Sequence, residues 1–150
     1  MAIIQGPVAK GSQAVAYPST AGETITNRYE MQVTIAPTPG APVANDILEI
    51  GSLPPNCAVA DMFIDTDILT GITAADVGIM SGAPGSTDPA RTCGNEFFGA
   101  QTLVAAGVFR MSKQSGFRVA PSPAERSIGI KINAAASVAG KVALIVQLAA

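Results

Sequence analysis

Strand-like runs and turn residues follow one another closely between residues 47 and 80, and this rhythm restricts the chain to a β fold. Pro54 and Pro55 lack the N–H group that a strand ladder requires, so the chain has to turn there. Gly51 is expected to close the run before that turn. Strands this short and this closely spaced are typical of antiparallel sheets. The strand candidates cover residues 47–50, 57–64 and 77–80, the last reached through an apolar run at 68–72.

Alternation of apolar and polar residues predicts further strands on either side of this stretch. A strand is expected from Glu30, with Met31, Val33 and Ile35 on one face. The clearest alternation lies in the C-terminal pair of runs, which we expect to be adjacent and antiparallel. The last run has apolar residues on both faces, which suits a central strand or an edge that a neighbouring subunit covers. These later candidates cover residues 107–111, 117–120, 127–132 and 142–148.

The number of short strands and the many Pro and Gly corners predict an all-β fold. The simplest arrangement is an antiparallel β-sandwich of jelly-roll type, and 150 residues fit one such domain. We expect the sandwich to cover residues 30–150. Residues 1–29 have no sustained period and contain Pro7 and Pro18, so they are expected to form an extended N-terminal arm, with a frayed terminus as the alternative.

The segment at 81–101 is much longer than an ordinary connection and is rich in Gly, Pro, Ser and Asp. Phe97 and Phe98 lie inside it. Two aromatic residues in a polar loop either pin the loop to its own domain or insert into a partner, and we favour the first. Residues 101–106 are compatible with a short helix or a strand.

The composition argues against nucleic acid and membrane as partners. The formal net charge is −2 and no basic run occurs, whereas binding to phosphates needs clustered Lys and Arg. No apolar run approaches the roughly 20 residues that span a bilayer, and the start lacks the basic residues of an export signal.

Only 13% of the residues are charged, and the mean hydropathy is +0.36. Protein partners are therefore expected to cover much of the surface, although a neutral surface rich in Gly, Ala and Thr is the alternative.

No catalytic, cofactor-binding or metal-binding residues can be assigned. The chain has no histidine, which excludes Ser-His-Asp and Cys-His arrangements and histidine metal sites. Asp61, Asp65 and Asp67 lie close together, but acids that flank a strand end explain them better than a calcium site or a glycosidase pair. Cys57 and Cys93 fit neither a zinc site nor a disulfide framework and are expected to be buried thiols, although their spacing does not decide whether they pair.

Three short motifs resemble the head decoration, or cement, proteins of tailed bacteriophages. They are the ILEIG run at 47–51, the LPPNC turn at 53–57 followed by VAD at 59–61, and the DVGI run at 76–79. The resemblance implies a jelly-roll-like domain that forms dimers or trimers on the outside of an icosahedral head. We favour the trimer, because the low charge density and the two-faced last run leave apolar surface that symmetric closure would bury. It implies the major capsid protein as partner, a place in the virion and in the host cytoplasm during assembly, and no enzymatic activity. It carries over no functional residues, so the partner-binding residues stay unassigned.

A carbohydrate- or receptor-binding β-sandwich module of a phage or bacterial surface is the alternative function. Sugar-binding surfaces usually stack rings on exposed aromatic side chains, and this chain has no Trp, two Tyr and five Phe. This shortage favours the structural role.

Overall fold

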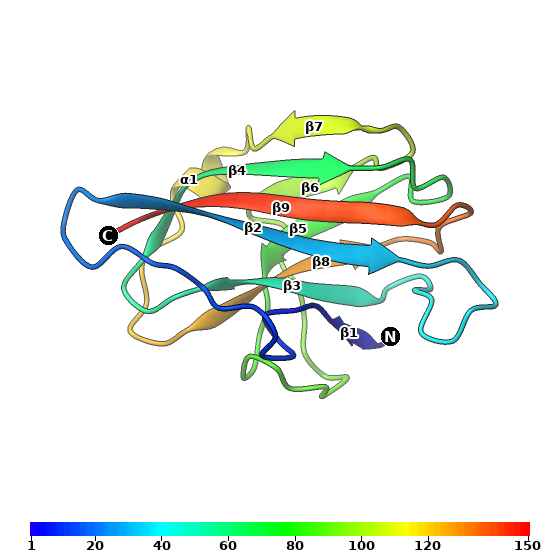
Figure 1. The fold of residues 1–150 in the computed structure, drawn as a ribbon, viewed down its shortest axis with the longest axis horizontal. Coiled ribbons are helices and arrows are strands. Elements are labelled where there is room, and N and C mark those ends of the chain that lie inside the picture. Colours follow the sequence, from blue (N-terminus) through cyan, green and yellow to red (C-terminus); the bar gives the residue numbers. More distant parts are fainter.

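Nine strands form two sheets that pack face to face in the computed structural model, which describes residues 1–150 (Figure 1). One sheet has the order β1-β3-β8-β5-β6 and the other the order β2-β9-β4-β7. All neighbouring strands are antiparallel except β1 and β3, which are parallel. The strands are β1 Ile3–Gln5, β2 Thr24–Val33, β3 Ile47–Leu53, β4 Ala58–Thr66, β5 Ala75–Ile79, β6 Phe98–Gln101, β7 Gly107–Arg110, β8 Arg126–Ile132 and β9 Gly140–Ala149.

The chain winds back and forth between the two sheets. Only β5 and β6 are consecutive strands that pair with each other. When β1 is left aside, β2-β9-β4-β7 facing β3-β8-β5-β6 corresponds to the strand order of an eight-stranded jelly roll. The predicted antiparallel β-sandwich is confirmed.

The two closing strands do not pair with each other, contrary to the expectation from sequence. β8 lies between β3 and β5, whereas β9 lies between β2 and β4 in the other sheet. The connection at 133–139 crosses from one sheet to the other, which local alternation cannot reveal. Both strands are central in their sheets. The sequence left open whether β9 is a central strand or an edge that a neighbouring subunit covers, and its central place explains the apolar residues on both of its faces.

Gly51 lies inside β3 because a side chain from the opposite sheet occupies the space beside it. The ring of Tyr29 on β2 is fully buried, and a Cβ on residue 51 would stand 2.7 Å from its Cδ2 atom. The Tyr29 hydroxyl also donates a hydrogen bond to the carbonyl oxygen of Ser52 at 3.1 Å. The expectation that Gly51 ends the strand was wrong, since β3 continues to Leu53.

Other predicted boundaries were also wrong. β2 begins at Thr24 instead of Glu30 and ends at Val33, so Ile35 lies beyond the strand and is exposed. The run at 68–72 is a loop whose Leu69 and Ile72 pack on the end of the core. Residues 117–120 are not a strand, because the single turn α1 (Gln114–Phe117) and irregular chain take their place. Residues 102–106 are neither helix nor strand.

The only helix is the single turn α1, so no helix is long enough to cross a membrane.

The long segment at 81–101 contains one strand and is held to its own domain. β6 forms its last part, and the Met80 and Cys93 backbones make an isolated antiparallel bridge. Phe97 and Phe98 are buried in the core cluster. The predicted pinning of the loop by its aromatic pair is confirmed.

The N-terminal residues lie along the sandwich. β1 pairs with β3 through the register Ile3↔Ile47 to Gln5↔Glu49, and Ile4, Val8 and Val15 pack against the core from outside. Residues 24–29 belong to β2, so the extended part of the chain ends before Thr24. A role of this segment as an arm that binds a neighbour stays a prediction.

Candidate interaction surfaces

Four loops meet at one end of the sandwich and form a surface that we name the charge-poor end. They are the connections 34–46, 67–74, 102–106 and 133–139, which lie at the right in Figure 1. Hydrogen bonds tie three of them together, from Leu69 N to Leu103 O at 2.9 Å and from Ser137 N to Thr70 O. The only charged residues in these loops are Asp46, which is buried, and Asp67, whose carboxylate accepts a hydrogen bond from Lys141 N.

The charge-poor end also carries exposed apolar side chains. Ile35, Val43, Ile68 and Val138 are 37%, 54%, 51% and 49% exposed, and they make up half of the large apolar side chains on the surface. The connections at the opposite end include Lys113, Arg118 and Glu125. An uncharged surface with several apolar side chains is typical of a protein–protein contact.

The outer face of the four-stranded sheet has the opposite character. Arg28 pairs with Asp65 at 2.7 Å and Arg110 pairs with Asp61 at 2.9 Å. Glu30 lies near both Arg28 and Lys141, at 3.3 Å from each. The acids at 61 and 65 are therefore partners of arginines, and no group of three His, Cys, Asp or Glu side chains is placed to hold a metal ion. Asp65 lies at the end of β4 and Asp67 follows it, as the strand-end interpretation predicted.

The two cysteines are separate thiols. Cys57 is buried and Cys93 is half-buried, and neither forms a disulfide. Burial raises the pKa of Cys93 to about 12, and it also raises the pKa of Cys57. Both side chains are therefore neutral near pH 7, which makes them poor nucleophiles. Cys57 is a buried thiol as predicted, whereas Cys93 is only half-buried.

A buried ion pair joins β3 to the long loop that follows β5. Glu49 on β3 is 1% exposed and Arg91 in the long loop is 2% exposed, and their side chains meet at 3.0 Å. The same Glu49 Oε1 atom accepts hydrogen bonds from Gly85 N at 2.9 Å and Ser127 Oγ at 2.5 Å. Burial opposes ionisation of Glu49, but the hydrogen bonds from Arg91, Ser127 and Gly85 outweigh it, so the pKa of Glu49 lies below its ordinary value.

Sequence reasoning missed this ion pair. The available signal was a glutamate inside the apolar run ILEIG, because a charged residue is rarely buried unless it has a partner. Nothing in the sequence pointed to Arg91, which lies 42 positions away in a polar loop.

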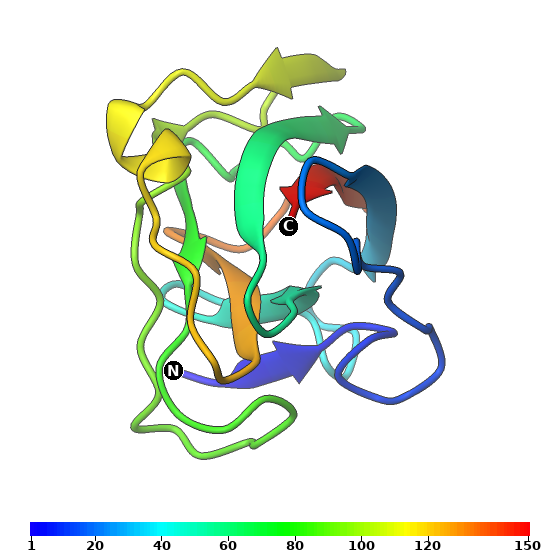
Figure 2. The ribbon, with the colours of Figure 1, turned by 90° about the vertical axis from the view of Figure 1, so that its left-hand side faces the viewer.

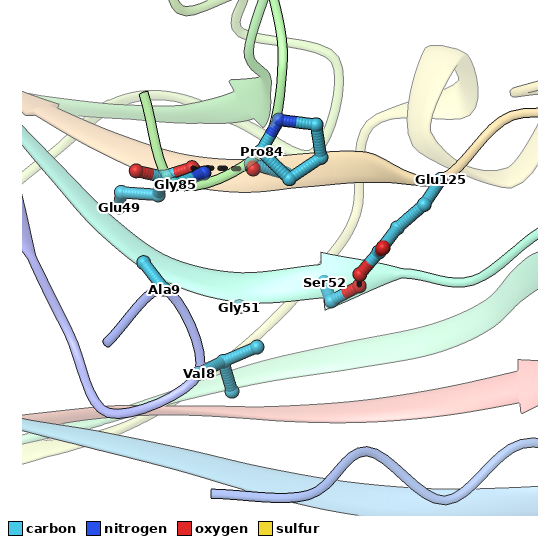
Figure 3. A pocket seen from close by; sticks show the side chains of 9 residues that line it. Val8, Ala9, Glu49, Gly51, Ser52, Pro84, Gly85 and Glu125 are labelled. Carbon is cyan, nitrogen blue, oxygen red and sulfur yellow. Dashed lines mark hydrogen bonds between the residues drawn. The ribbon is translucent and has the colours of Figure 1, made fainter. Parts of the chain in front are cut away.

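A cavity of about 200 Å³ lies beside Glu49. The N-terminal segment forms one wall with Val8 and Ala9, and the long loop forms another with Pro84 and Gly85 (Figure 3). Figure 3 also shows the Ser52 hydroxyl bound to Glu125 at the far side, at 2.6 Å. The cavity therefore lies where the N-terminal segment, β3 and the long loop meet.

The chain matches no protein-family model and no curated protein. Among solved structures it is similar to a chain in the capsid of Ralstonia phage GP4. The sequence identity is 36%, the TM-score is 0.88, and the match covers 98% of this chain and 97% of the other.

Two further capsid structures share the fold at low sequence identity. A chain of the cyanophage Pam1 capsid asymmetric unit has a TM-score of 0.59 and 18% identity, over 93% of this chain and 94% of that one. A chain of the acid-stable capsid of the Helicobacter pylori bacteriophage KHP30 has a TM-score of 0.56 and 14% identity, over 87% and 90%. These two similarities bear on the fold alone.

Proposed function

The chain belongs to a family of bacteriophage capsid proteins and has a structural role in the virion, and from this premise we propose that it is a head decoration, or cement, protein. In this role it binds the outer surface of an icosahedral head and stabilises the contacts between major capsid subunits. The observation that carries the proposal is the charge-poor end, an exposed apolar surface on a domain that contains no catalytic arrangement.

The charge-poor end is the surface that we assign to the contact with the major capsid protein. Its four loops bring together side chains from all parts of the chain, and they contribute only one exposed charge, that of Asp67. Burying such a surface removes apolar area from water without stripping water from many charges. Ion screening affects such a contact little.

A homotrimer is the assembly that we propose for the protein on the head, with a dimer as the alternative. Charged residues make up only 13% of the chain, so much of its surface can be buried against copies of itself without desolvating ions. Closed symmetry buries such a surface in every copy and leaves no exposed end for further growth.

A cement protein acts by mass action. It binds the assembled lattice more tightly than free or rearranged subunits, and each copy bound at 100 times its dissociation constant adds about 2.7 kcal/mol. Many copies on one shell therefore produce a large total even when each contact is modest.

Heads assembled with and without the protein test this proposal directly. We expect decorated heads to survive heating to a higher temperature before they release their contents, measured with a dye that reports exposed DNA. The difference should be similar at about 50 mM and about 500 mM salt, because the contact contains few charges. Equal rupture temperatures with and without the protein would contradict the cement function and favour the alternative, a carbohydrate- or receptor-binding module.

Matched substitutions test which surface makes the contact. Ile68→Lys places a charge at the charge-poor end, whereas Phe117→Lys places one on an exposed apolar residue at α1. We expect the first to weaken binding to undecorated heads about tenfold or more and the second to leave binding nearly unchanged. The same loss in both variants would contradict the assignment of the surface.

A further inference from the structure

The N-terminal segment and the long loop lie side by side along one edge of the molecule. Figure 1 and Figure 2 both show the dark blue start of the chain next to the green loop that follows β5. The Gln5 side-chain amide donates a hydrogen bond to the carbonyl oxygen of Gly85. A Cβ on residue 85 would stand 3.4 Å from the carbonyl oxygen of Ala9, and the φ of +79° at Gly85 suits glycine. The two segments are therefore in direct contact.

Glu49 holds both segments at once. Its backbone pairs with Gln5 in the β1–β3 register, and its carbonyl oxygen accepts a hydrogen bond from Gly6 N at 2.9 Å. Its carboxylate accepts hydrogen bonds from Gly85 N and from Arg91 Nη2 in the loop. The backbone of Glu49 thus holds the N-terminal segment, and its side chain holds the loop.

Residues 82–91 have few other attachments to the rest of the protein. Arg91 donates its other hydrogen bonds to the carbonyl oxygens of Ser81 and Ser86, within the loop itself. Apart from the Arg91 bond to the adjacent Ser81, the hydrogen bonds that leave this stretch end on Glu49 or on its β1 partner Gln5. The order of the loop therefore depends on the same residues that hold β1.

We propose that Glu49 couples the N-terminal segment and residues 82–91 into one cooperative unit, so that lifting either segment loosens the other. The coupling is reciprocal, because a free energy shared by two segments acts equally in both directions. A partner that binds one segment would also order the other. The coupling is a property of the free protein, so it stands or falls independently of the proposed cement function.

Hydrogen exchange of backbone amides in the free full-length protein tests the coupling in both directions. Gln5→Ala removes the side-chain bond to Gly85 but leaves the backbone of β1 intact, and we expect the amides of residues 83–91 to exchange about fivefold faster. Arg91→Leu acts on the loop side, and we expect the Gly6 and Ile47 amides, which bond across the β1–β3 edge, to exchange faster by a similar factor.

Gln13→Ala is the matched control. Gln13 also lies in the N-terminal segment, but its side chain bonds to the carbonyl oxygen of Arg28 and not to the loop. Exchange in residues 83–91 should be unchanged in this variant. Either of two results would overturn the coupling. One is faster loop exchange in Arg91→Leu with no change at Gly6 or Ile47. The other is an equal effect of Gln5→Ala and Gln13→Ala on the loop. If Arg91→Leu does not fold, the comparison of the two glutamine variants decides.

Discussion

Glu49 is the residue on which the largest group of buried polar contacts converges. Its Oε1 atom accepts three hydrogen bonds, one from a side chain of β8 and two from the long loop, while Oε2 has no partner. A buried ion pair contributes little net stability compared with apolar residues, but removal of one partner leaves the other charge buried alone. Glu49 therefore acts mainly by fixing where the loop lies.

Replacement of Glu49 by Gln should lower the free energy of unfolding at pH 7 by about 3 kcal/mol, because Arg91 would keep a buried charge without its partner. The wild-type carboxyl has a pKa below its ordinary value of 4.5 in the folded state. Its stabilising contribution is therefore fully present above that ordinary value and is lost as the pH falls through the lower, folded-state pKa. Urea unfolding between about pH 3 and 7 should show a weaker acid dependence in Glu49→Gln than in the wild type.

Glu30→Gln is the control for this measurement. Glu30 makes its ion pairs with Arg28 and Lys141 at the surface, where such pairs contribute less than about 1 kcal/mol. Equal losses of stability in the two variants would show that the buried ion pair contributes no more to the free energy of unfolding than a surface ion pair.

Among the elements, β1 is the one whose attachment differs most from the rest. It has three residues, pairs only with β3, and is the only parallel strand. The other eight strands form both sheets without it, and Ile4 in β1 and Val8 after it are partly buried and pack against the core. The segment before Thr24 thus covers the edge of the sandwich.

Deletion of residues 1–20 should leave a folded domain with reduced stability. The core strands remain, but Ile4, Val8 and Val15 no longer cover apolar surface. Circular dichroism should retain the β spectrum while the thermal midpoint falls, and binding to undecorated heads should weaken if the segment is an interaction arm. Loss of soluble protein would place the segment within the essential core, and unchanged binding would argue against the arm.

Across the whole molecule, charge is distributed unevenly. The outer face of the four-stranded sheet carries a network of ion pairs, whereas the charge-poor end has four exposed apolar side chains and one exposed charge. Three of the four edge strands are short, since β1 has three residues and β6 and β7 have four each, and short edges limit uncontrolled pairing of sheets between molecules. The fourth edge strand, β2, has ten residues.

The proposed homotrimer predicts a solution mass of about three times 15.1 kDa at tens of micromolar. Light scattering coupled to size exclusion measures this mass. High salt should not dissociate the oligomer, because apolar contacts are not screened by ions. A monodisperse species at 15.1 kDa would contradict self-association in the free protein, and a mass of twice this value would favour the dimer.

The sequence by itself determined the fold class and most of the strands. Two-residue alternation and proline corners act locally, so the strands at 58–66, 75–79, 107–110, 126–132 and 140–149 were found to within a few residues. The absence of histidine excluded Ser-His-Asp and Cys-His arrangements and histidine metal sites, and the short motifs between residues 47 and 79 were enough to indicate a phage head protein. The burial of Phe97 and Phe98 followed from the general behaviour of aromatic side chains in polar loops.

Only the tertiary structure decided which segments meet. The separation of β8 from β9 into opposite sheets, the place of Gly51 beside the Tyr29 ring, and the pairing of Glu49 with Arg91 all depend on contacts between residues far apart in the chain. The charge-poor end likewise exists only because the jelly-roll winding brings four separate loops to one end. Periodicity reports the environment of a residue relative to its neighbours in sequence, whereas these features depend on how the strands are ordered in space.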